Sequence, residues 1–208
     1  MNLNWYKSLE WYRKNKKVKK VLFVCTANAC RSPAAEYYFN NMTHWWSGVS
    51  AFSRGTEVNK IMAELKSRGI NLKKMMIEKE SKKVIGDRTS VFIAQHSSKQ
   101  ITSKDVLRAD LVLTMEKSVR DKLRGEYPDA AYKIFTLKGF IMQADNLSEG
   151  LDIGNPFIPP PIRKKEGIIE GNIGYYRYLQ NYAKIFKDVE MCTRRLIEII
   201  YLINSEKR

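Results

Sequence analysis

Apolar residues along the chain fall into short continuous runs that alternate with stretches of helical spacing. The first run, residues 21–24, is wholly apolar and rich in β-forming residues, which is typical of a strand buried on both faces of a sheet. Similar runs predict further strands at residues 49–52, 109–115 and 132–137. The intervening spacing predicts helices at residues 32–45, 57–68, 103–108, 117–124 and 175–203. Strands that alternate with helices in this way predict a parallel α/β sheet with right-handed crossovers.

Two of the predicted helix boundaries are marked by particular residues. Ser32 followed by Pro33 predicts a helix start, with a hydroxyl at the cap and a proline at the first helical position. Gly69 is expected to end the helix at residues 57–68. Residues 21–45 should therefore form a strand, a tight loop and a helix in direct succession.

The 208 residues are enough for one domain with a sizeable core. We expect residues 1–19 to form a basic, aromatic N-terminal extension and residues 20–208 to form a single α/β domain. Two insertions are expected in that domain, a lysine-rich one near residues 73–90 and one near residues 159–172. The second overlaps a long polar, proline-rich loop at residues 145–166, which is called the late loop below.

The cysteine count and the hydropathy bear on the compartment. Three cysteines cannot form a fully paired disulfide framework, which favours a reduced, cytoplasmic location. No apolar run reaches about 18 residues, so no membrane span is expected. The first residues lack the apolar core of an ordinary secretory signal, so none is expected.

The charge balance favours an anionic partner. Lysine and arginine number 37 against 22 aspartate and glutamate residues, a formal net charge of +15. Residues 1–20 hold seven of the basic residues and one acidic residue. The extension could pack its aromatic side chains on the body, or bind a lipid surface or another acidic partner as an amphipathic helix. Nucleic acid is not expected, because no nucleic-acid-binding motif accompanies the charge.

The loop between the first strand and its helix carries the candidate chemistry. A helix N-terminus directs backbone N–H groups at one spot and binds an oxyanion readily. Cys25 ends the strand at the mouth of this field, which favours a nucleophilic thiolate. Arg31 can bring a planar guanidinium opposite a tetrahedral anion, and Ser32 can donate to the sulfur. Asn28 tolerates left-handed dihedrals and can hold the curl of the loop.

The string Cys-x-x-Asn-x-Cys-Arg-Ser-Pro at residues 25–33 resembles the signature of the low-molecular-weight protein tyrosine phosphatases. The similarity continues through residues 53–56, 96–100, 109–115 and 152–157. It implies a four-stranded parallel sheet flanked by helices, in a three-layer α/β/α arrangement, with the phosphate site at the carboxyl end of the strands.

The resemblance also implies roles for individual residues. Cys25 would form a phosphocysteine, Ser32 would tune the loop, and Ser53 would support Asn28. Phe157 would pack against the aromatic ring of the substrate, unless it is a core residue in a turn. The phosphoryl group would be bound by the phosphate loop, residues Thr26, Ala27, Asn28, Ala29, Cys30 and Arg31.

One departure from the family pattern concerns the general acid. The family has an Asp-Pro pair in the late loop, and this chain has Asn155-Pro156. An amide cannot give a proton to a leaving group, and general acid catalysis is worth about 10²–10⁴-fold. Asp152 or Asp145 could supply the proton, the protein could bind phosphotyrosine without hydrolysing it, or the residue could reflect a trapping substitution or a weak enzyme.

Three further residues bear on specificity and redox behaviour. Ala27 stands where the family usually has glycine, at a cost of about 1 kcal/mol if the backbone there is unusual. Ala29 lacks the hydroxyl that the related arginine phosphatases carry, which disfavours phosphoarginine. Cys30 could form a reversible disulfide with Cys25 or be a small buried filler.

Other chemistries are less consistent with the sequence. The thioredoxin-coupled arsenate reductases share this loop but need two further redox cysteines in the middle of the chain. No cysteine lies between Arg31 and Met191, which excludes that reaction. His44 and His96 are isolated, so neither a metal nor another cofactor is expected.

These observations predict a phosphotyrosine protein phosphatase that hydrolyses phosphate monoesters of a protein or peptide, with activity reduced by Asn155. The alternative is a catalytically impaired module that binds phosphoproteins.

Overall fold

The computed structural model describes residues 12, 17–69, 89, 92, 95–143, 150–155 and 168–205, with the backbone alone at residues 168–179. Phe157, Asp145 and most of the residues in the extension and in the two predicted insertions lie outside the described residues.

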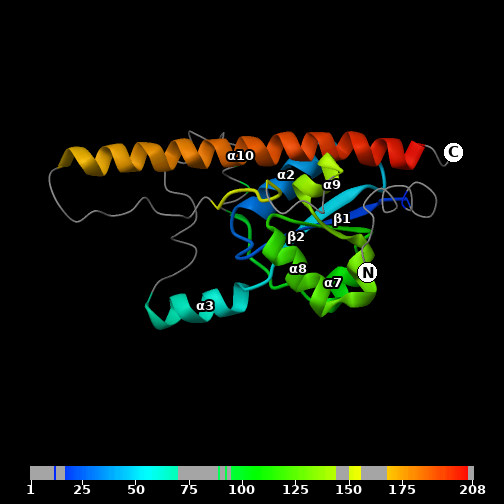
Figure 1. Cartoon of the computed structure of the whole chain (residues 1–208), viewed down its shortest axis with the longest axis horizontal. Helices are drawn as coiled ribbons and strands as arrows, with labels where there is room; N and C mark the ends of the chain where they lie inside the picture. The colour runs from blue at the N-terminus through cyan, green and yellow to red at the C-terminus, as the bar shows by residue number, and fades with distance from the viewer. Residues whose placement is uncertain are drawn as a thin grey trace.

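The sheet has four parallel strands in the order β2-β1-β3-β4 (Figure 1). β1 spans Lys20–Cys25 and lies in the centre, with Cys25 paired to Gly55 at the end of β2. The remaining strands are β2 (Ser50–Gly55), β3 (Leu111–Thr114) and β4 (Ile134–Thr136). The four predicted strands are thus confirmed, each with its ends shifted by a few residues.

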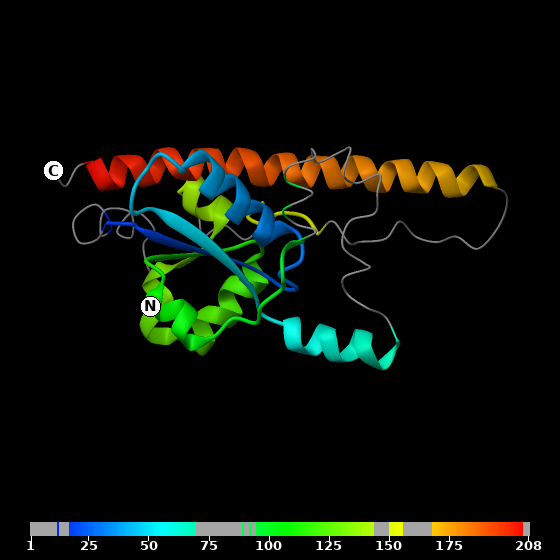
Figure 2. The same ribbon diagram turned by 180° about the vertical axis from the view of Figure 1, so that it is seen from behind.

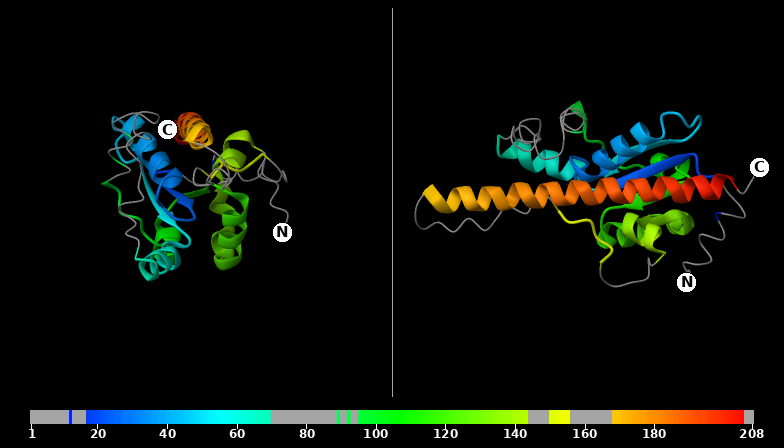
Figure 3. Two further views of the ribbon diagram at one scale, coloured as in Figure 1. Left: turned by 90° about the vertical axis from the view of Figure 1, so that its left-hand side faces the viewer. Right: turned by 90° about the horizontal axis from the view of Figure 1, so that it is seen from above.

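Helices cover both faces of the sheet. The helical elements are α2 (Arg31–Met42), α3 (Val58–Ser67), α7 (Ser103–Arg108), α8 (Lys117–Glu126), the 3-10 helix η1 (Pro128–Lys133), α9 (Leu137–Met142) and α10 (Ile168–Ser205). Figures 1 and 3 show α2, α9 and α10 on one side of the sheet and α7 and α8 on the other. The predicted three-layer α/β/α fold is therefore confirmed.

Alternation along β1 explains the two layers. Val21, Phe23 and Cys25 belong to the core under α2 and α10, and Leu22 and Val24 belong to the core under α7 and α8. All five side chains are buried, as expected for a central strand covered on both faces.

Two helices extend beyond the sheet. α10 has 38 residues and begins earlier than the predicted residue 175. α3 projects from the body after β2, and only Val58 of its side chains is buried (Figure 2). α3 is followed by Gly69 at a φ of +69°, so the predicted helix end is confirmed. Among the helices of the described residues, none combines the length and apolar character that a bilayer crossing requires.

The predicted cap of α2 is wrong. The N-cap is Cys30, without a side-chain hydrogen bond, so Ser32 and Pro33 lie inside the first turn. A proline is tolerated there because the first N–H groups of a helix have no partner within the helix. The Ser32 hydroxyl is consequently available for contacts with the loop before it.

The extension contacts the body through Tyr12. This ring is fully buried, lies edge-on to Phe140 and donates a hydrogen bond of 2.6 Å to the carbonyl oxygen of Asp110. This contact agrees with the interpretation that the extension packs its aromatic residues on the domain.

Candidate active site

The phosphate loop lies at the carboxyl end of β1, between that strand and the N-terminus of α2. Cys25 is 3% exposed and receives hydrogen bonds from two directions. The Asn28 backbone N–H donates to its Sγ over 3.2 Å, and the Ser32 Oγ lies 3.0 Å from it. The site is at the edge of a parallel sheet where α/β proteins bind ligands.

Asn28 holds the curl of the loop. It is fully buried at a φ of +51°, in the left-handed region. Its Nδ2 donates to the hydroxyl oxygens of Ser32, over 3.1 Å, and of Ser53, over 2.8 Å. The predicted support of Asn28 by Ser53 is present in the geometry.

The other side of Asn28 is held by the segment before α7. The Lys99 backbone N–H and His96 Nε2 both reach Asn28 Oδ1, over 2.8 and 3.1 Å, and the Ser98 hydroxyl donates to the Asn28 carbonyl oxygen. A backbone N–H can only donate, so Oδ1 is the acceptor and His96 carries its proton on Nε2.

A carboxylate sets the direction of the remaining hydrogen bonds. Ser53 Oγ donates to Glu36 Oε2 over 2.6 Å, so it accepts from Asn28. Ser32 Oγ also accepts from Asn28, which leaves its proton for the sulfur at 3.0 Å or for the Arg54 carbonyl oxygen at 3.4 Å. Burial raises the pKa of Glu36 above its usual value. The chain of hydrogen bonds therefore directs the Ser32 hydroxyl at Cys25 from behind the loop.

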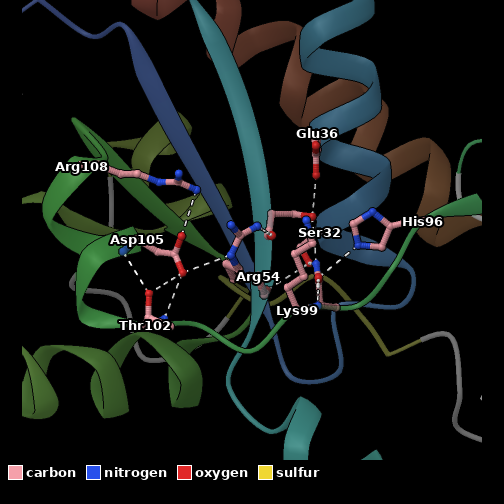
Figure 4. Close-up of polar contacts among 10 residues, drawn as sticks. Ser32, Glu36, Arg54, His96, Lys99, Thr102, Asp105 and Arg108 are labelled. Atoms are coloured by element: carbon pink, nitrogen blue, oxygen red, sulfur yellow. Dashed lines mark hydrogen bonds and ion pairs between the residues drawn. The ribbon is translucent and has the colours of Figure 1, made fainter.

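A second polar cluster joins the end of β2 to α7. Figure 4 shows Asp105 between Arg54 and Arg108, with Thr102 beside it, and Glu36, Ser32, His96 and Lys99 on the other side of β2. Burial tends to raise the pKa of Asp105, but hydrogen bonds from the Thr102 hydroxyl, over 2.8 Å, and from Arg54 Nε, over 3.1 Å, hold it below its usual value. Arg54 lies between Ser53 and Gly55 at the end of β2, so this cluster holds that end of the strand beside the phosphate loop.

The guanidinium of Arg31 is buried, at 5% exposed, and is anchored through one nitrogen. Nη1 donates to a Glu116 carboxylate oxygen and, over 2.9 Å, to the Ile153 carbonyl oxygen. Within the described part of the chain, neither Nη2 nor Nε of Arg31 donates a hydrogen bond. Two donors of a fixed, buried cation are thus available to an oxyanion.

The remaining loop residues differ in their surroundings. The Thr26 carbonyl oxygen accepts from the Glu57 backbone N–H over 3.0 Å, which ties the loop to the start of α3. Ala29 is buried. Ala27 has no strained backbone, because Asn28 and Gln143 are the only non-glycine residues with positive φ in the described ranges. The substitution of alanine for glycine at position 27 therefore has no conformational cost.

Cys30 faces α10 instead of solvent. Its Sγ lies 2.9 Å from the hydroxyl of Tyr182, whose ring stacks on Phe186 at 4.9 Å. Burial raises the pKa of Cys30 to about 12, so the thiol stays protonated. All three cysteines are free. Cys30 therefore fills space in the core and contacts α10 through Tyr182.

The late loop approaches the site through its described residues 150–155. The Ile153 backbone N–H bonds to the Met115 carbonyl oxygen after β3, and the Ile153 carbonyl oxygen accepts from Arg31. Asn155 follows two residues later and is exposed. Asp152 Oδ1 accepts from the Lys117 backbone N–H over 2.6 Å, at the first turn of α8. The carboxylate proposed as a substitute acid is thus already bound to a helix end.

Several residues of the site were not identified as such in the sequence. No motif in the sequence marks Glu36, Glu116 or Ser98, and His96 stands isolated from other metal-binding side chains. The only available signal was the family-like segment at residues 96–100. Across the described residues, no group of three or more histidine, cysteine or acidic side chains is placed to hold a metal.

Comparison with known proteins identifies the family. Residues 20–200 match the family model described as low molecular weight phosphotyrosine protein phosphatase. The chain belongs to this family. A protein-arginine-phosphatase from Geobacillus stearothermophilus is 31% identical over 141 residues, which are 68% of this chain and 80% of that protein. A putative low molecular weight protein-tyrosine-phosphatase from Klebsiella pneumoniae is 24% identical over 173 residues, 82% of this chain and 89% of that one.

A solved structure agrees with this assignment. The low molecular weight protein tyrosine phosphatase from T. tengcongensis aligns with a TM-score of 0.53 and 27% identity, over 86% of this chain and 97% of that one. The family is thus a hydrolase family whose members act on phosphorylated substrates, with both arginine and tyrosine phosphatases among the relatives of this chain.

Gly55 is expected to be intolerant of a side chain. A Cβ at this position would lie 2.6 Å from Val58 Cγ2, 2.7 Å from the Thr26 carbonyl oxygen and 2.8 Å from the Asn28 backbone nitrogen. Gly55→Ala should therefore displace the loop, lower the free energy of unfolding by about 1–3 kcal/mol and weaken inorganic phosphate binding. Chemical denaturation and calorimetric titration measure the two effects.

Gly125→Ala is the matched control for Gly55→Ala. Gly125 is exposed in α8, and a Cβ there would meet nothing within 4 Å. This variant should keep phosphate affinity and gain up to about 1 kcal/mol of stability. Equal effects of the two substitutions would contradict the close approach at Gly55.

His96 predicts a pH dependence of stability. Burial, together with the charges of Lys99 and Arg54, lowers its pKa from 6.5 to about 4. Between these values the unfolded chain binds a proton that the folded chain does not, so the free energy of unfolding should fall as the pH falls from about 6.5 to about 4. His96→Gln can still donate to Asn28 Oδ1 but cannot titrate. Denaturation at pH values of about 5 and about 7 should show a smaller difference for this variant, and an unchanged difference would refute the assignment.

Proposed function

We propose that the chain removes phosphate from phosphotyrosyl proteins or peptides through a phosphocysteine at Cys25, and that Asn155 reduces its rate. The observation that carries this proposal is the pairing of the Cys25 sulfur, with two donors directed at it, and the anchored Arg31 with two donors available. A nucleophile and an oxyanion clamp at one loop are the parts that phosphoryl transfer requires.

In the first step, the Cys25 thiolate attacks phosphorus while Arg31 and the loop amides bind the equatorial oxygens. The bond between phosphorus and the leaving oxygen breaks, and Asn155 can donate a hydrogen bond to that oxygen but not a proton. In the second step, water attacks the phosphocysteine and the sulfur leaves as a thiolate. Ser32 stabilises this thiolate with its hydroxyl, because the Asn28 amide occupies the oxygen from the other side.

The tyrosyl preference is supported by Ala29. Its methyl group is buried in the loop and carries no hydroxyl, whereas the family resemblance implies a hydroxyl at that position in arginine phosphatases. Phe157 remains a proposed wall for an aromatic ring. The basic residues of the extension remain a proposed surface for an acidic partner.

A binding module without turnover is the second candidate, favoured by the amide at position 155. Acid quenching during reaction with p-nitrophenyl phosphate, followed by mass spectrometry of the Cys25 peptide, distinguishes the two. A phosphorylated Cys25 peptide together with continuing turnover supports the enzyme. Phosphate binding with neither signal would support the module.

Asn155→Asp should raise kcat/KM for phenyl phosphate by about 10²–10⁴-fold, because a carboxyl at this position can protonate a poor leaving group. The rate should then acquire a falling limb at high pH, where the new acid is ionised. A pH–rate profile of both proteins measures the effect, and an unchanged rate would show that position 155 does not face the leaving group.

A further inference from the structure

The carboxylates described near the phosphate loop accept hydrogen bonds or form ion pairs. In the late loop, Asp152 accepts from the Lys117 backbone N–H over 2.6 Å, and its carbonyl oxygen accepts from Lys138 Nζ over 3.1 Å. Moving Asp152 toward a substrate would break the contact at the start of α8. Asn155, two residues beyond the carbonyl oxygen that binds Arg31, carries an amide.

Two further carboxylates, those of Glu116 and Glu36, also have partners. Glu116 is ion-paired with the buried guanidinium of Arg31. Glu36 accepts the proton of Ser53 behind the loop, on the side of Asn28 that faces away from the sulfur. Glu57 bonds to the Thr26 carbonyl oxygen through its backbone N–H, and its carboxylate lies 3.5 Å from Lys122 Nζ. These described carboxylates beside the loop thus already have partners.

A phosphate cradle with an amide in place of the family's general acid selects substrates by their leaving group. Resting on the phosphocysteine chemistry proposed above, we infer that the site also takes acyl phosphates, the mixed anhydrides of phosphate and a carboxylate, and accepts their phosphoryl group faster than that of an aryl phosphate. A phenol has a pKa near 10, whereas a carboxylic acid has one near 4, so the carboxylate departs much more readily as an anion. Cys25 can still attack phosphorus, and Arg31 can still stabilise the charge on the phosphoryl oxygens. An acyl phosphate does not need a proton donor for its leaving group in the first step.

The atoms balance without a proton donor in the first step. The Cys25 thiolate forms a bond to phosphorus, the bond from phosphorus to the acyl oxygen breaks, and its electron pair leaves with the carboxylate. In the second step water forms a bond to phosphorus, the sulfur departs as the thiolate with the electron pair of the broken bond, and both protons of the water remain on the phosphate product. No oxidant, reductant or second substrate is involved.

Measurements of kcat/KM test this inference, because this parameter reports the steps up to the loss of the leaving group. The full chain should hydrolyse acetyl phosphate with a kcat/KM at least about 10²-fold above that for phenyl phosphate, after subtraction of the rate with Cys25→Ser. Asn155→Asp should raise kcat/KM for phenyl phosphate by about 10²–10⁴-fold and for acetyl phosphate by less than about threefold.

The matched control is Asn41→Asp. Asn41 is exposed on α2, and the substitution adds the same charge without placing a carboxyl at position 155. It should leave both rates unchanged. Equal gains on both substrates from Asn155→Asp, or turnover of p-nitrophenyl phosphate without turnover of acetyl phosphate, would overturn the inference while leaving the proposed function intact. Failure to phosphorylate Cys25 with any of the three substrates would instead defeat the proposed function.

The source of the acyl phosphate is resolved by a second probe. A protein domain phosphorylated on an aspartate is compared with acetyl phosphate at equal concentration. A higher kcat/KM for the domain supports an aspartyl phosphate of a protein as the substrate, and a higher value for acetyl phosphate supports a small acyl phosphate. No release from either, beyond the rate with Cys25→Ser, refutes the inference.

Discussion

Cys25→Ser should abolish the turnover of p-nitrophenyl phosphate, with a loss of about 10⁴-fold or more, while inorganic phosphate still binds. The reason is that bond formation depends on the sulfur, whereas binding depends on the backbone amides and Arg31. A serine hydroxyl at this position remains protonated at neutral pH and is a weak nucleophile without an adjacent base. Steady-state kinetics measure the loss, and calorimetric titration with phosphate measures the binding that remains.

Cys192→Ser is the control for this prediction. Cys192 is buried on α10, in the core between that helix and the sheet, so the same chemical change is made in a comparable environment. Its turnover should stay within about twofold of the starting protein. A loss in Cys25→Ser that is smaller than predicted, or a comparable loss in Cys192→Ser, would contradict the assignment of Cys25 as the nucleophile.

The fold was largely predictable because its signals are local. The run at residues 21–24 is apolar on both faces, and each further strand has a similar run and a helix after it. The prediction missed η1 and α9, which have six residues each. Both elements adjoin β4, and the apolar run assigned to a strand at residues 132–137 overlaps the end of η1 and the start of α9.

The candidate site was predictable mainly where its residues are contiguous or lie in segments that resemble the family. The string from Cys25 to Ser32 indicated the loop and a contact between the Ser32 hydroxyl and the Cys25 sulfur, and only the assignment of Ser32 as the helix cap was wrong. That contact is oriented through Ser53, which is far from the loop in sequence and meets it through the pairing of β1 with β2. Such long-range hydrogen bonds leave no pattern in the chain.

Arg31→Lys should lower kcat/KM by about 10³–10⁵-fold even though the charge is kept. The guanidinium bonds Glu116 and the Ile153 carbonyl oxygen through Nη1 and still presents Nη2 and Nε to an oxyanion. An ammonium has one nitrogen, so it can reach Glu116 or the phosphoryl group but cannot hold both in a fixed geometry. Phosphate affinity should fall together with the rate, because the same two donors bind the ground state.

Arg120→Lys separates this effect from the loss of a buried guanidinium in general. Arg120 on α8 is also 5% exposed and is paired with Asp121 at 2.8 Å. Its substitution should alter stability but leave kcat/KM and phosphate affinity within about twofold. If Arg31→Lys affects the rate no more than Arg120→Lys does, the anchored guanidinium is a structural ion pair, and the phosphoryl oxygens must be held by the backbone amides alone.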